Sequence, residues 1–260
     1  MGSLSDFAEN EVLDHILGVG AYTPPATVYL ALSTADPTDA GSGLAEPSGN
    51  GYARTAIAFG AASARAIANS AVVTFPQASG AWGTITHWAL MHAAAGGSML
   101  AHGEVEPDQA IVALNTPSFA IGQIQVSWNT GAISTYLANK VLDFLFRNQA
   151  FTPPTIHAGL ATAAIADATT GTTVTEPSGN NYARKAHAAW DAASGGASEN
   201  TGALTFNTPS GAWGTIIRAF LADAATLGNI LFYATQSPSQ APQNGDTVSY
   251  PDGAWDVSLS

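Results

Sequence analysis

The chain has 260 residues, of which 46% are hydrophobic but only 10% are Asp, Glu, Lys or Arg. Its formal net charge is −12, from 19 acidic and 7 basic residues. Binding to nucleic-acid phosphates needs clustered Lys and Arg, so we expect no nucleic-acid partner. The absence of cysteine excludes disulfide bonds, a thiolate zinc site and a cysteine nucleophile.

The sequence does not show the pattern of a secretory signal or of a membrane span. No run approaches the roughly 18 consecutive apolar residues of a membrane span. Residues 1–17 contain four acidic side chains and no Lys or Arg, which is the wrong charge pattern for a secretory signal. We therefore expect no membrane insertion, and synthesis and folding in the cytoplasm.

The two halves of the chain repeat one another at a spacing of about 130 residues. The segment Glu46–Arg54 returns at Glu176–Arg184, and Ser79–Ile85 returns unchanged at Ser210–Ile216. A period this long predicts that each copy is a domain with its own core. We place the first domain at residues 1–130 and the second at 131–260, with the boundary near Thr130–Gly131.

Each repeat opens with a predicted helix. In the first repeat Ser5 is the expected N-cap, apolar residues follow at helical spacing, and Gly18 and Gly20 end the helix. In the second repeat Ser134 is the expected N-cap and the helix ends near Asn148.

After the helix, the apolar period changes to two and turn-forming residues separate the segments. In the first repeat we predict strands over 27–32, 54–59, 72–75, 84–90, 99–102 and 118–128. The connections are too short for crossover helices. The predicted fold is therefore mainly β, with two tandem antiparallel β-sandwich or barrel domains, each preceded by one N-terminal α-helix.

The sequence lacks a credible catalytic or metal-binding constellation. His87 and His92 lie five residues apart, which in a strand places them on opposite faces. The acids present in both halves are Asp14 with Asp143, on the polar stripe of the helix, and Glu46 with Glu176, before a turn. We interpret Asp14 as an exposed or capping acid and Glu46 as a loop residue that binds backbone amides or pairs with Arg54. We therefore predict no catalytic residue, no metal, no cofactor and no enzymatic activity.

Trp82 and Trp213 occupy the repeated Gly-Ala-Trp-Gly-Thr segment. One interpretation is a core residue whose indole N–H meets a backbone carbonyl, and the other is a platform on which a sugar stacks. The core interpretation is favoured, because a Trp that enters a strand from a tight turn usually packs inside.

Tyr52-Ala53-Arg54 and Tyr182-Ala183-Arg184 are also kept in both halves. Because charged residues are scarce in this chain, the retained Arg54 and Arg184 indicate either an ion pair inside the domain or a contact with a partner protein. Tyr52 and Tyr182 accompany them in either case, so we treat these four residues as candidate interface or ligand contacts.

The order of these motifs resembles a known family. The segments Leu4–Gly18, Tyr22–Pro37, Glu46–Arg54 and Ser79–His87 together resemble small virion proteins of tailed phages and phage-like gene transfer agents, described as tail-fibre-like or capsid decoration proteins. Residues 4–128 carry the resemblance, and residues 133–260 repeat it more loosely. The family has no catalytic motif to carry over, and this chain departs from its single-domain form in being doubled.

The resemblance implies a non-enzymatic virion component that docks on the assembled particle as a capsid decoration, head fibre or tail fibre. Its implied partners are the major capsid or tail protein and further copies of itself in a homo-oligomer. Its implied location is the host cytoplasm during assembly and then the virion surface. A carbohydrate-binding adhesin that attaches to a host glycan is the alternative.

Overall fold

The computed structural model describes residues 2–129 and 132–259 of the chain. The protein is mainly β, with antiparallel strand pairing throughout its named sheets and two helices, as predicted. The predicted repeat boundary near Thr130–Gly131 lies outside the described residues. Among those described, no helix combines the length and apolar character needed to cross a membrane.

The chain divides into two compact units whose limits cut through the helices. One unit comprises Met1–Glu9, Thr23–Asn129 and Asn139–Phe151, and the other comprises Asn10–Tyr22, Thr130–Ala138 and Thr152–Ser260. Each unit therefore combines the β strands of one repeat with most of the helix of the other. The domain limits 1–130 and 131–260 stay a prediction about which segments fold together.

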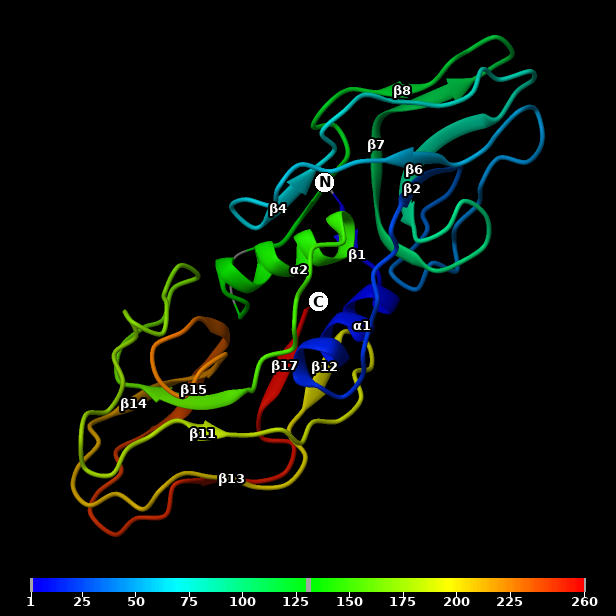
Figure 1. Cartoon of the computed structure of the whole chain (residues 1–260). Helices are drawn as coiled ribbons and strands as arrows, with labels where there is room; N and C mark the ends of the chain where they lie inside the picture. The colour runs from blue at the N-terminus through cyan, green and yellow to red at the C-terminus, as the bar shows by residue number, and fades with distance from the viewer. Residues whose placement is uncertain (1, 130–131, 260) are drawn as a thin grey trace. The chain divides into compact units, whose positions relative to one another are not determined.

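The first unit is built on one sheet of five strands in the order β1-β7-β6-β2-β3. These strands span Ser3–Leu4, Met99–Ile111, Gly83–Met91, Val28–Ser33 and Thr55–Ile57, in that order. Two short ribbons complete the unit, one of β4 (Ala66–Ala68) with β9 (Gln125–Ser127) and one of β5 (Val73–Thr74) with β8 (Ser118–Phe119). Figure 1 shows β6 and β7 as the long central pair of this sheet.

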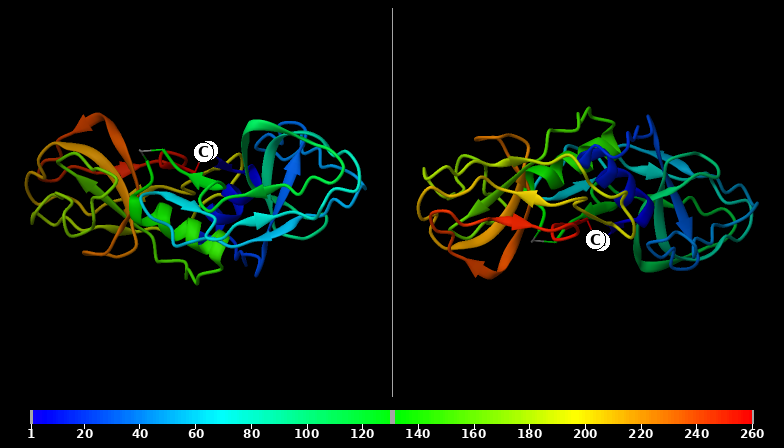
Figure 2. Two further views of the ribbon diagram at one scale, coloured as in Figure 1. Left: turned by 90° about the horizontal axis from the view of Figure 1, so that it is seen from above. Right: turned by 90° about the horizontal axis from the view of Figure 1, so that it is seen from below.

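The second unit repeats this plan with a sheet of four strands in the order β11-β10-β14-β15. They span Lys185–Ala186, His157–Ala161, Ile216–Ala222 and Ile230–Gln240. The ribbons pair β12 (Ala197–Glu199) with β17 (Asp256–Ser258) and β13 (Leu204–Thr205) with β16 (Ser249–Tyr250). Figure 2 shows the strong curvature of β15, drawn in orange.

The helices begin and end where the sequence predicts. Helix α1 spans Asp6–Leu17, Oγ of Ser5 accepts a hydrogen bond from the Ala8 amide at 3.3 Å, and Gly18 follows at φ +75°. Helix α2 spans Thr135–Arg147, and Oγ of Ser134 accepts a bond from the Leu137 amide at 3.1 Å.

The polar face of each helix binds the backbone of a β-ribbon loop. In the second unit, side-chain oxygens of Asn10 and Asp14 accept hydrogen bonds from the amides of Gly196 (2.9 Å) and Ala193 (2.7 Å). Figure 1 shows α1 beside β12 and β17. The same contacts recur in the first unit, at 2.9 Å each, between Asn139 and Arg65 and between Asp143 and Ala62. The interpretation of Asp14 as an exposed or capping acid is thus wrong, because its carboxylate holds a loop.

Two predicted strands of the first repeat differ markedly from the observed ones, and the short strands β1 and β4 are not among those predicted. The segment predicted over 118–128 is broken into β8 and β9 by a turn in which the Gln123 amide bonds to the Ala120 carbonyl and Gly122 adopts φ +79°. Strand β7, predicted over 99–102, continues to Ile111 as the partner of β6. The turn decides where β8 ends and β9 begins, and pairing with β6 decides how far β7 extends. The alternation of apolar residues within a segment shows neither.

Candidate functional site

The candidate residues Tyr52 and Arg54 meet Glu46 in one cluster behind β2. The guanidinium of Arg54 donates to both carboxylate oxygens of Glu46, through Nε at 3.1 and 3.0 Å and Nη2 at 2.5 Å. Its Nη1 donates to the carbonyls of Ala93 (2.8 Å) and Gly96 (2.6 Å). The expected pairing of Glu46 with Arg54 is therefore present, and it ties the connection between β2 and β3 to the connection between β6 and β7.

The hydroxyl of Tyr52 completes this cluster. It donates to Oε2 of Glu46 at 2.7 Å and accepts from the Leu32 amide at 3.0 Å. Burial is the main cause that raises the pKa of Tyr52 above its ordinary range, so the phenol stays protonated.

The second repeat builds the same cluster from Glu176, Tyr182 and Arg184. Arg184 donates to both oxygens of Glu176 (2.7–3.1 Å) and to the carbonyls of Ala224 and Leu227. Tyr182 donates to Oε2 of Glu176 at 2.8 Å, and burial raises its pKa as well. With every charge paired, neither cluster leaves a free acid or base for catalysis.

Trp82 and Trp213 lie in the core next to these clusters. They are 5% and 3% exposed. The indole N–H of Trp82 donates to the carbonyl of Asn50 at 2.9 Å, and that of Trp213 donates to the carbonyl of Asn180 at 2.8 Å. Tyr52 meets Trp82 edge to face with ring centroids 5.2 Å apart. This geometry corresponds to the core interpretation; a role of either Trp in ligand contact stays a prediction.

Outside these clusters, Asp36 lies 3.9 Å from both His87 and His102, and His102 also contacts Asp39 at 2.8 Å. Within residues 2–129 and 132–259, no group of three or more His, Cys, Asp or Glu could hold a metal ion. His87 lies 3.9 Å from Asp36, whereas Nδ1 of His92 accepts the Ser98 amide at 2.7 Å. The two histidines thus have separate partners.

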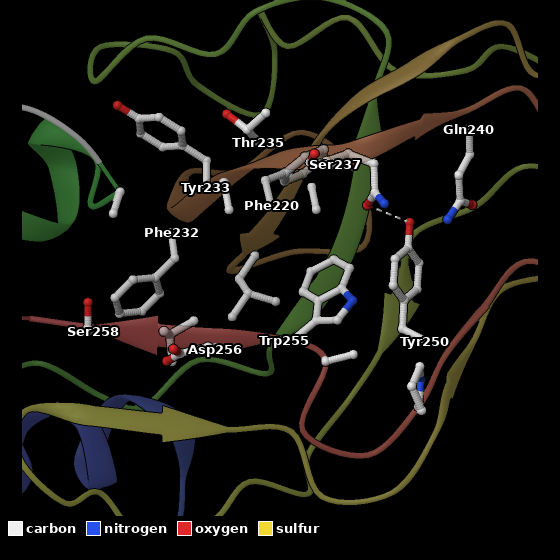
Figure 3. A pocket seen from close by; sticks show the side chains of 18 of the residues that line it. Phe220, Phe232, Tyr233, Thr235, Ser237, Gln240, Tyr250, Trp255, Asp256 and Ser258 are labelled. Carbon is white, nitrogen blue, oxygen red and sulfur yellow. Dashed lines mark hydrogen bonds between the residues drawn. The ribbon is translucent and has the colours of Figure 1, made fainter.

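A hollow of about 550 Å³ lies in the second unit, between β14, β15 and the segment Ser249–Ser258. Figure 3 shows aromatic rings and polar side chains that together line it, among them Phe232, Tyr250, Trp255 and Gln240. These residues are not predicted from the sequence motifs, because the motifs are what the two repeats share and the residues around the hollow differ between them. The sequence does show one difference between the repeats that points to the hollow: Trp88 of the first repeat corresponds to Ala219 of the second.

Fold and clusters together define a class of protein: a tandem-repeat β protein in which the residues common to both repeats build buried structural clusters. The particular family follows from sequence comparison. The chain matches the family described as "Podophage GP4 fiber I protein gp80" over residues 3–127 and again over residues 132–258, and it belongs to this family. The resemblance to phage fibre proteins in tandem duplication is thereby confirmed. No curated protein matches the chain.

Proposed function

We propose that the chain is a non-enzymatic accessory component of the virion surface, which docks on the assembled particle as a fibre or decoration protein and forms a homo-oligomer. Membership in a phage fibre family supports a place in the virion. The absence of a free acid or base in the Glu-Tyr-Arg clusters supports a structural role for them. We assign the major capsid or tail protein as the partner.

The distribution of exposed apolar side chains supports the first repeat as the anchor. Four large ones, Val72, Val112, Leu114 and Ile121, lie in the first unit and are 55–75% exposed. Their counterparts in the second repeat are small or polar, namely Ala203, Gln243, Gly245 and Asp252. The second unit has two large exposed apolar side chains, Val19 and Leu227, so the first unit presents more apolar area for a contact surface.

The exposure and backbone conformation of Leu114 are the main support for the first repeat as the anchor. Leu114 is 75% exposed and adopts φ +72°, a conformation that costs a residue other than glycine about 1 kcal/mol or more. The equivalent turn of the second repeat has Gly245 at φ +85°. Leu114 lies in one turn with Val112, which is 55% exposed, and together they offer adjacent apolar area to a partner, whereas Leu227 of the second unit has no other large exposed apolar residue in its turn.

The test is docking of the purified chain on particles of its source phage that lack it, measured by co-sedimentation and by immunogold labelling. The wild type is expected to bind, and label over the head or over the tail identifies the partner. The triple variant Val112→Gln, Leu114→Gly and Ile121→Asp introduces the residues that the second repeat tolerates in the same turns. It should fold and lose docking.

Leu227→Gly is the matched control, because Leu227 is 62% exposed and adopts φ +57° in the second unit. Leu227 corresponds to Gly96 of the first repeat. Replacing Leu227 by glycine should leave docking unchanged. A monomeric wild type without affinity for any particle would sink the proposed function. Unchanged docking of the triple variant would overturn the anchor assignment.

A further inference from the structure

The two repeats differ in the size of a hollow that each unit has beside its long hairpin. The hollow of the second unit, here called the β15 hollow and bounded by Phe220, Phe232, Gln236, Tyr250 and Trp255, measures about 550 Å³. The corresponding hollow of the first unit measures about 220 Å³. Only the larger one is in the size range of small-molecule sites.

A paired substitution accounts for the difference in volume. Trp88 of β6 pairs with Gly103 of β7, whereas the equivalent pair of the second unit is Ala219 with Ala234. A Cβ atom on Gly103 would lie 2.5 Å from Cζ2 of Trp88, so the indole of the first repeat requires the glycine. The second repeat has neither the indole nor the glycine, and the space stays open.

The second repeat adds aromatic and polar groups to this space. Trp255 takes the position of Ile124, since the amides of both bond to the side-chain oxygen of an asparagine, Asn200 and Asn69. Tyr250 takes the position of Phe119 and donates its hydroxyl to Oε1 of Gln236 at 3.0 Å. Figure 3 shows this bond at one side of the hollow.

Trp255 keeps a hydrogen-bond donor for a ligand. In Figure 3 its indole nitrogen faces the space beside Tyr250. In the part of the chain that the structure describes, nothing accepts a hydrogen bond from this nitrogen, although the residue is only 7% exposed. Trp82 and Trp213, by contrast, donate to backbone carbonyls. This nitrogen is open to solvent through the hollow and is not sealed in the core, so a ligand oxygen can replace water as its acceptor.

The charge of the lining excludes several classes of ligand. The described lining residues include no Lys, Arg or His, and Asp256 is the single acid, so an anion would find no counter-charge. A purely apolar ligand would leave amide and hydroxyl groups such as those of Gln240, Ser237 and Thr235 without partners. The remaining class of ligand is a neutral molecule with an apolar face that can lie against the aromatic rings and hydroxyl groups that can bond to the polar side chains of the lining.

We propose that the β15 hollow binds a neutral hexopyranose unit of a glycan. The C–H face of the sugar lies against the aromatic wall, a ring or hydroxyl oxygen accepts from Nε1 of Trp255, and hydroxyl groups bond to Gln236 and Gln240. This proposal deepens the proposed function and rests on it for its setting, because a virion-surface component is in a position to meet host glycans.

The experiment is saturation-transfer NMR of the full chain with methyl glycosides of glucose, galactose, mannose, N-acetylglucosamine and rhamnose, with sialic acid as the anionic comparison. At least one neutral glycoside should show saturation transfer, and sialic acid should show none. The double variant Ala219→Trp with Ala234→Gly fills the hollow as the first repeat does, so it should fold and weaken binding at least about tenfold, or about 1.4 kcal/mol. Trp255→Phe keeps an aromatic ring but loses the donor, and should weaken binding about three- to tenfold.

The anchor variant Val112→Gln, Leu114→Gly and Ile121→Asp should bind the sugar as the wild type does, which separates a failure of this proposal from a failure of docking. The proposal is overturned if no neutral glycoside shows transfer to a folded wild type that still docks on particles. It is overturned equally if the double variant binds the sugar like the wild type. A change of oligomeric mass in the double variant without sugar binding would identify a second copy as the occupant and refute the glycan.

Discussion

The indole of Trp82 is bound to the backbone of Asn50, whose own side chain binds the backbone just before the tryptophan. The indole N–H donates to the Asn50 carbonyl at 2.9 Å, and Nδ2 of Asn50 donates to the carbonyl of Ala81, next to the indole, at 2.8 Å. A Cβ atom on Gly80 would lie 2.6 Å from Oδ1 of Asn50, so the glycine is needed for the approach. This arrangement explains why Ser-Gly-Asn and Ser-Gly-Ala-Trp recur together in both repeats.

Trp82→Ala should lower the free energy of unfolding by about 3–5 kcal/mol, because it removes a buried ring and leaves the Asn50 carbonyl without its donor. Chemical denaturation followed by circular dichroism measures this change. Val72→Ala, at a side chain 58% exposed, is the control and should stay within about 0.5 kcal/mol of the wild type. A Trp82→Ala protein as stable as this control would restore the ligand-platform interpretation.

Arg54→Lys should be nearly as damaging as Arg54→Ala. Two nitrogens of Arg54 donate to Glu46 and the third donates to two backbone carbonyls, whereas a lysine has one ammonium group and cannot reach all of these acceptors. Breaking a mostly buried ion pair leaves the Glu46 carboxylate without its partner and costs about 3–5 kcal/mol.

The measurement is chemical denaturation of Arg54→Lys, Arg54→Ala, Glu46→Gln and the double variant Glu46→Gln with Arg54→Ala. The last three, compared with the wild type, give the coupling energy between the two residues. A large coupling energy is expected, since they form one network. Full rescue by lysine would contradict the requirement for the planar guanidinium.

Much of the fold could be predicted because its signals are local. Ser5 and Ser134 as helix caps, the glycine after α1 and the pairing of Glu46 with Arg54 each depend on residues close together in sequence. The Glu-Tyr-Arg cluster could be suspected because three residue types with matching chemistry recur at one spacing in both halves.

The helix contacts and the β15 hollow could not be predicted in the same way. The sequence shows that an aspartate occurs at this helix position in both repeats, as Asp14 and Asp143. The partner of Asp14, the Ala193 amide, lies 179 residues away and cannot be predicted from the helix. The change from Trp88 to Ala219 is visible in the sequence, but its effect on volume depends on the strand register that places Gly103 and Ala234 opposite. Both features come from long-range pairing, which spacing within a segment does not determine.

Asp14→Ala should loosen the loop that precedes β12, because the Ala193 amide loses its acceptor. Amide hydrogen exchange around Ala193 is expected to accelerate several-fold. Asp14→Asn retains a side-chain oxygen and should exchange at close to the wild-type rate. Asp143→Ala should produce the equivalent change at Ala62. Unchanged exchange at both amides would show that these bonds contribute nothing to loop stability.

Glu9 should make the protein less stable as the pH rises. Its side chain lies in the first turns of α1, where burial first, then the charges of Asp39 and Asp6, raise its pKa from 4.5 to about 7. The unfolded chain loses this proton near pH 4.5 and the folded chain keeps it up to about pH 7. Between these values the folded state binds more protons, so the contribution of Glu9 to stability declines as pH increases through this window.

Glu9→Gln keeps the neutral shape and removes the titration. Its melting temperature relative to the wild type should therefore increase between about pH 5 and about pH 8. The contact of His102 with Asp39, at 2.8 Å, is common to both proteins, so the difference between them reports Glu9 together with its interaction with Asp39. Glu11→Gln on the same helix is the matched control and should not show this gain. If both variants follow the wild type at every pH, the carboxyl of Glu9 titrates alike in the folded and unfolded chain.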